Sequence, residues 1–192
     1  MEDNLVDIKQ QYCDYLEASK GPIGPSASTR NNPVYATSAP IKRKEILQEW
    51  EKLLIQKSKK YTKSQSLSTY KEDVKAIKDE MNDSFKGLVS FKISHAQKSF
   101  SVYLKYQWCK GIISQPPPSC PVDSMVLCRI GWPYCKERWT TMSENKLFEI
   151  LDLLDAKAGG TNKVAEMELK WFYEMSNYIK QHRNRNHDKN NS

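Results

Sequence analysis

The sequence contains no apolar run that approaches the roughly 20 residues a helix needs to cross a bilayer. Its opening stretch, MEDNLVDIKQ, is acidic and lacks the apolar core of a signal peptide. These absences argue against membrane proteins and predict a protein that works inside the cell, in the cytoplasm or associated with the nucleoid.

Residues that bind metals are scarce. The chain has three histidines, and two of them, His182 and His187, lie in a polar C-terminal stretch. Its five cysteines include no C-x-x-C pair, and their odd number favours reduced thiols packed as small apolar groups. We therefore expect no metal site, no iron–sulfur cluster and no cofactor.

No segment alternates apolar and polar residues with the two-residue period of a strand, and no internal repeat is present. Apolar residues instead recur every three or four positions, which predicts helices. Helices are expected over 3–18 and 41–61, and after Ser66, Ser94, Asp123, Ser143 and Thr161. On the last helix, one apolar stripe would contain Val164, Met167, Trp171, Met175 and Ile179. The predicted fold class is all-α, with a single compact multi-helix domain.

Composition divides the chain into four parts. Residues 1–19 form an N-terminal helix, and residues 20–41, rich in Gly, Pro, Ser and Asn, form a linker or long loop. Residues 42–182 form the helical domain, and residues 183–192 form a disordered basic tail.

Positive charge exceeds negative charge. The chain has 30 Lys and Arg against 23 Asp and Glu, a net charge of +7 and a pI near 9.0. This favours a polyanionic partner. The basic clusters can equally be ordinary solvated helix faces.

The segment from Ser94 to Gly131 contains the side chains best suited to chemistry. Lys98 opens an aromatic-rich helix, a proline-rich loop follows, and Asp123 opens a second short helix. This arrangement can place Lys98 and Asp123 at the mouth of one cleft. A carboxylate there could stabilise a sugar with oxocarbenium character while a glycosidic bond breaks. A lysine becomes nucleophilic when burial or neighbouring cations lower its pKa, and the positive end of a helix dipole also disfavours its charged form.

The runs AQKSFSVYL and CPVDSMVLCRIG resemble the helix-hairpin-helix superfamily of DNA glycosylases. The match covers roughly 40 residues, and the long loop between the runs is closest to the archaeal oxoguanine glycosylase branch. The resemblance implies that Lys98 is the nucleophile and Asp123 the family's aspartate. The family's hairpin glycines are replaced here by Ser94 and Ala96, which implies a wider or remodelled hairpin.

The resemblance implies double-stranded DNA as the partner, bound by a monomer. A glycosylase must flip its target base into an aromatic pocket and hold the flanking phosphates. The expected pocket residues are Trp108, Trp132, Tyr134, Trp139 and His95. The expected DNA-binding residues are Ser94, Gln97, Lys105, Lys110, Arg129, Lys136 and Arg138.

Three functions follow from these patterns. The first is a DNA glycosylase that excises a damaged or modified base, in repair or in defence against modified foreign DNA, with or without AP-lyase activity. The second is a non-catalytic DNA-binding helical module. The third is a protein-interaction domain. Simpler roles for the site residues also stand: Lys98 as a solvated side chain, Asp123 as a helix cap, and His95 as a buried group with one backbone hydrogen bond.

Overall fold

A computed structural model describes residues 2–19, 21, 23, 34–36 and 42–190, with side chains described from Asn4 to Ile179 within these ranges. This part of the chain contains seven α-helices and no strand, which confirms the all-α prediction. The helices are α1 (Glu2–Ala18), α3 (Arg43–Ser58), α4 (Leu67–Ser84), α5 (Ile93–Cys109), α6 (Ser124–Ile130), α7 (Glu144–Ala158) and α8 (Thr161–Asn190). Short 3-10 turns are η2 (Lys59–Thr62), η3 (Tyr134–Lys136) and η4 (Trp139–Thr141).

Side-chain caps set several of the predicted helix ends. The Ser66 side chain accepts a hydrogen bond from the Thr69 amide at the start of α4, and Ser143 accepts one from Lys146 at the start of α7. These bonds satisfy amides that have no partner inside the helix. At the other end of α7, Gly159 adopts a left-handed conformation with φ of +75°, which glycine tolerates without steric cost.

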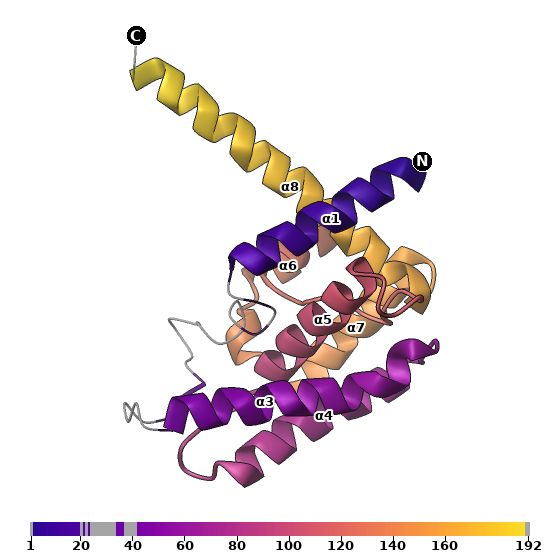
Figure 1. The fold of residues 1–192 in the computed structure, drawn as a ribbon, viewed down its shortest axis with the longest axis vertical. Coiled ribbons are helices and arrows are strands. Elements are labelled where there is room, and N and C mark those ends of the chain that lie inside the picture. Colours follow the sequence, from indigo (N-terminus) through magenta and orange to yellow (C-terminus); the bar gives the residue numbers. More distant parts are fainter. Residues whose placement is uncertain (1, 20, 22, 24–33, 37–41, 191–192) are drawn as a thin grey trace.

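Helix α5 is the centre of the domain. It packs against α1, α3, α4 and α7, and η4 also contacts it (Figure 1). From Ile93 to Lys105 every residue of α5 is buried except Lys98. The side chains of a helix surrounded by other helices must be apolar or must form hydrogen bonds or ion pairs inside the protein, and α5 has side chains of both kinds.

Polar groups on α5 have partners from neighbouring helices. Ser99 accepts a hydrogen bond from the indole of Trp50 on α3 at 3.0 Å, and Ser101 bonds with the phenol of Tyr70 on α4. Lys105 forms an ion pair with Glu168 of α8, and both side chains are almost fully buried. The Lys105 ammonium also lies 3.9 Å from the centre of the Tyr12 ring on α1. Lys105 therefore joins three helices from inside the core.

Helices α1 and α8 pack against each other, and the far end of α8 extends beyond the rest of the domain (Figure 1). The buried residues of α8 are Val164, Ala165, Glu168 and Leu169. The apolar stripe predicted for this helix is only partly right, because Met175 and Ile179 are exposed. The α8 helix continues to Asn190, past the end expected at residue 182.

Most of the linker predicted over 20–41 falls outside the described residues. Within its described part, Val34 is buried, and Tyr35 forms an isolated antiparallel bridge with Val89. In the described part of the chain, none of the helices has the length and apolar composition that crossing a membrane requires. The division into four parts stays a prediction.

Removing one partner of the Lys105–Glu168 pair should destabilise the fold. We expect Glu168→Leu to lower the free energy of unfolding in urea by about 3–5 kcal/mol, because it leaves a buried ammonium without its carboxylate. The double variant Lys105→Met with Glu168→Leu should recover most of that loss. The exposed pair Lys170–Glu166 is the control, and breaking it should cost less than about 1 kcal/mol. Wild-type stability in the single variant would contradict the prediction.

Candidate functional site

Lys98 is the one position on the buried stretch of α5 where the helix reaches solvent. Its side chain is 13% exposed. It is the sixth residue of α5, so it lies beyond the first turn, where the helix dipole acts most strongly. The expectation that Lys98 stands at the helix N-terminus is wrong, because the helix begins about one and a half turns earlier, at Ile93.

Asp123 is held at the start of α6. Its Oδ1 accepts hydrogen bonds from the amides of Met125 at 3.0 Å and Val126 at 3.2 Å. These bonds make Asp123 the N-cap of α6 and fix the orientation of its carboxylate. The capping role considered from the sequence is therefore present, and it leaves Oδ2 available for a second partner.

That second partner is Lys98. The Lys98 Nζ lies 3.4 Å from the Asp123 Oδ2, and the Asp123 side chain is 28% exposed. The same ammonium lies 4.4 Å from the centre of the Trp139 ring. The structure thus brings together three of the predicted site residues, from α5, from the cap of α6 and from η4, at a place that solvent can reach.

Gln97 explains how the pair is positioned. Its Nε2 donates to the carbonyl of Cys120 at 2.7 Å, and its Oε1 accepts from the amide of Val122 at 3.0 Å. Nε2 also lies within hydrogen-bond distance of the Tyr70 phenol and the Ser101 hydroxyl. One buried amide side chain next to Lys98 therefore ties the backbone on both sides of Pro121 to α5, directly before Asp123. Sequence reasoning placed Gln97 at a DNA surface and missed this role.

Other predicted site residues lie in the core. Ser94, His95, Lys105 and Trp108 are each at most 4% exposed, so they cannot contact DNA or a flipped base in this conformation. The Nδ1 of His95 accepts a hydrogen bond from the backbone amide of Lys92 at the start of α5, as the simpler reading of that residue expected.

The hairpin implied by the family resemblance is not formed at the expected residues. Ser94 and Ala96, which replace the hairpin glycines, both lie inside the first turns of α5 and are buried. Their backbones are helical, so no glycine is needed there. The connection before α5 runs from Phe85 to Lys92, and the glycine it contains is Gly87.

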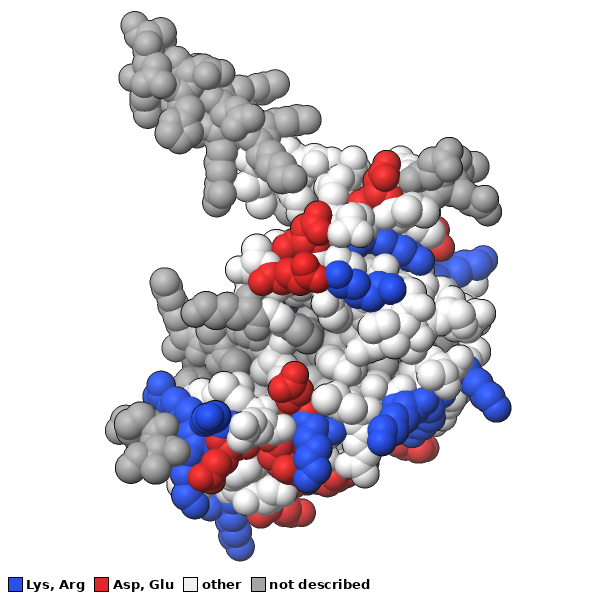
Figure 2. Space-filling view, viewed as in Figure 1, with Lys and Arg blue, Asp and Glu red and all other residues white. Residues whose placement is uncertain are grey.

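Among the remaining basic residues, two are paired with carboxylates. Lys110 forms an ion pair with Glu17 of α1, and Arg129 forms one with Glu174 of α8. Lys136 instead lies over the exposed Trp132 ring, 4.2 Å from its centre. On the face shown in Figure 2, Lys and Arg are interspersed with Asp and Glu over α1, α3 and α4 and form no single basic patch.

The charges of Asp123 and Lys98 act electrostatically on the buried Lys105–Glu168 pair. Burial raises the pKa of Glu168, the adjacent Lys105 opposes that shift, and the carboxylate of Asp123 adds to it. Burial also raises the pKa of Tyr12, with smaller contributions from Glu168 and Asp123. The Lys98 ammonium acts on the pKa of Glu168 in the direction opposite to Asp123, so the two charges of the site have opposing effects on the buried pair.

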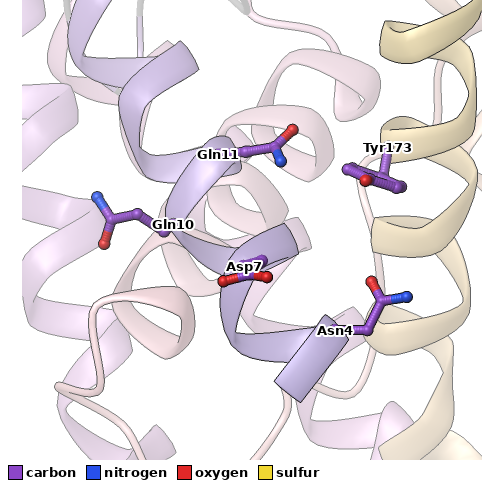
Figure 3. A pocket seen from close by; sticks show the side chains of 5 residues that line it. All are labelled: Asn4, Asp7, Gln10, Gln11 and Tyr173. Atoms are coloured by element: carbon purple, nitrogen blue, oxygen red, sulfur yellow. The ribbon is translucent and has the colours of Figure 1, made fainter. Parts of the chain in front are cut away.

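Hollows between α1 and α8 are lined by other residues. Figure 3 shows one of them, where Tyr173 of α8 faces the side of α1 that carries Asn4 and Gln11. Gln10, also at its edge, points away from α8. This hollow is open and its polar groups do not converge on one point. Within the described residues, no group of three or more His, Cys, Asp or Glu side chains is placed to hold a metal ion.

Comparison of the chain with protein-family models, with curated proteins and with solved structures finds no match. The function therefore has to be argued from the site itself.

Gln97→Leu should destabilise the protein and loosen the segment before Asp123. Replacing the amide leaves the Cys120 carbonyl and the Val122 amide buried without partners, which should cost about 1–3 kcal/mol of unfolding free energy. Hydrogen exchange at the Val122 amide should accelerate. The control is Gln107→Leu, which removes one half-buried bond to Tyr103. Unchanged exchange at Val122 would show that Gln97 does not hold this segment.

Proposed function

We propose that the chain is a DNA glycosylase that excises a damaged or modified base and uses Lys98 and Asp123 at the reacting sugar. The observation that carries the proposal is that these two groups, 25 positions apart in the sequence, meet at 3.4 Å where both side chains are partly exposed. Support also comes from the loop before Asp123 and the helix that Asp123 caps, which agree with that end of the sequence resemblance, although no hairpin is formed at Ser94 and Ala96.

Asp123 is suited to stabilising positive charge on the deoxyribose. As the bond between the base and C1′ breaks, its electron pair leaves with the base and C1′ acquires oxocarbenium character. The carboxylate is already oriented by two helix amides, so Asp123 itself need not move to meet that charge. The base takes up a proton from solvent or from a neighbouring acid as it departs.

Two routes can complete the reaction. In the hydrolytic route, Asp123 takes a proton from a water molecule as its oxygen adds to C1′. In the lyase route, the Lys98 amine adds to C1′ after losing its proton. Opening of the sugar ring then gives a Schiff base, and loss of a C2′ proton expels the 3′ phosphate. Water finally releases the lysine.

A non-catalytic DNA-binding module is the second candidate. It is favoured by the way the Lys98 ammonium is shared between the Asp123 carboxylate and the Trp139 ring, since both neighbours stabilise a positive charge. A structural ion pair would show the same geometry. This candidate predicts DNA binding that weakens with salt and no release of a base.

Asp123→Asn should abolish base release while the fold is retained. Asparagine caps helices about as well as aspartate, so the variant removes the charge and keeps the cap of α6. With DNA carrying a panel of modified bases, we expect the rate of abasic-site formation to fall by at least about 100-fold. Asp14→Asn, at an exposed position of α1, is the control. A full rate in Asp123→Asn would remove Asp123 from the chemistry.

Borohydride reduction tests the role of Lys98. In the lyase route, the reductant should trap a covalent complex between wild-type protein and DNA, detected as a band of increased mass. Lys98→Arg should give no such band, whereas Lys86→Arg, at an exposed position before α5, should behave like the wild type. Base release without a trapped complex would select the hydrolytic route.

A further inference from the structure

The segment from Gly131 to Met142, which joins α6 to α7, carries the most exposed large apolar side chain in the described part of the protein. Trp132 is 70% exposed. An indole left in water forgoes the free energy of burial, on the order of 2 kcal/mol for a large side chain. A single exposed apolar residue is common, so the surroundings of Trp132 decide whether it has a function.

One cation lies beside this tryptophan, and a second belongs to the same segment. The Lys136 Nζ lies 4.2 Å from the centre of the Trp132 ring. Within the described residues, neither Lys136 nor Arg138 forms an ion pair, in contrast to Arg129 and Lys146, which do. The segment therefore presents an exposed indole beside an ammonium that forms no ion pair with any described residue.

The segment is anchored on both sides of these residues. The η3 turn packs against α6, and η4 packs against α5. The Tyr134 ring is partly buried against the core, and its phenol donates to Glu149 of α7 at 3.4 Å. Trp139 lies against Lys98 at the other end. These contacts hold the backbone around Trp132 in place, so less conformational entropy is lost when a ligand binds to it.

We propose that Trp132, with Lys136 and Arg138, is a stacking platform for an unpaired DNA nucleotide. A largely exposed indole with an ammonium beside it, and a second cation in the same segment, fits one ligand chemistry in particular, an aromatic base joined to a phosphate. In paired duplex DNA both faces of a base are covered by its neighbours. The platform therefore selects DNA that is single-stranded or locally unpaired.

The platform lies close to Lys98 and Asp123. Helix α6 separates Trp132 from Asp123, and at a rise of 1.5 Å per residue its seven residues span roughly 10 Å. Successive stacked nucleotides are about 3.4 Å apart, so a nucleotide on Trp132 lies a few nucleotides from the pair. This step rests on the proposed function, and it gives that function a substrate class: a base in unpaired DNA.

Fluorescence anisotropy with a labelled oligothymidine of about ten nucleotides tests the platform. The full chain should bind this strand more tightly than a duplex of the same length at low salt. Trp132→Ala should weaken binding by about 5- to 100-fold, since stacking of one base is worth about 1–3 kcal/mol. Trp132→Phe should restore most of the affinity. Ile112→Ala, at a 62% exposed position, is the control and should bind like the wild type.

Salt dependence tests the charges. Lys136→Gln should reduce the slope of log affinity against log salt by about 0.7. Equal affinity of Trp132→Ala and wild type, or preference for the duplex, would overturn the platform. Tighter binding of an oligouridine would overturn its assignment to DNA. Asp123→Asn should bind the strand like the wild type, because it leaves the platform unchanged. Strand binding by a wild-type protein that releases no base would count against the proposed function alone.

Discussion

The structure depends on one constraint: between Ser94 and Lys105, α5 is buried except at Lys98, although this stretch carries six buried polar or charged residues, namely Ser94, His95, Gln97, Ser99, Ser101 and Lys105. A buried polar group without a partner costs about 1–3 kcal/mol. Each neighbouring helix therefore has to place a complementary polar group at the matching position along the α5 axis. Trp50 meets Ser99, Tyr70 meets Ser101, and Glu168 meets Lys105. These pairings set how the surrounding helices are placed around the centre.

The candidate site follows from the same constraint. The Gln97 side-chain amide forms hydrogen bonds with the backbone on both sides of Pro121. These bonds fix where α6 begins. Asp123, the cap of α6, then lies opposite Lys98, the residue next to Gln97. The pair is thus positioned by a core hydrogen bond and does not depend on a flexible loop. Lys98 itself needs no buried partner, because it is the one residue in this stretch of α5 that reaches solvent.

The sequence allowed the helices and several of their caps to be predicted, because these depend on local signals. Ser66 and Ser143 precede apolar runs, and the Gly pair after residue 158 ends one. The partners of α5 could not be predicted in this way. Lys105 looked like a surface cation because its partner, Glu168, lies 63 positions away. A signal was present nonetheless: Gln97, Ser101 and Lys105 recur every four positions, a polar stripe on a helix that is otherwise strongly apolar.

The geometry of Asp123 places a condition on any chemistry at this site. Its Oδ1 is occupied by two amides of α6, so a sugar with developing positive charge would have to approach Oδ2, where the Lys98 ammonium lies. Two cations cannot share one carboxylate oxygen without strong repulsion. Excision through Asp123 therefore requires Lys98 either to give up its proton or to move towards Trp139 as the substrate enters. The first option makes Lys98 a nucleophile, and the second makes it a counter-ion that leaves when DNA arrives.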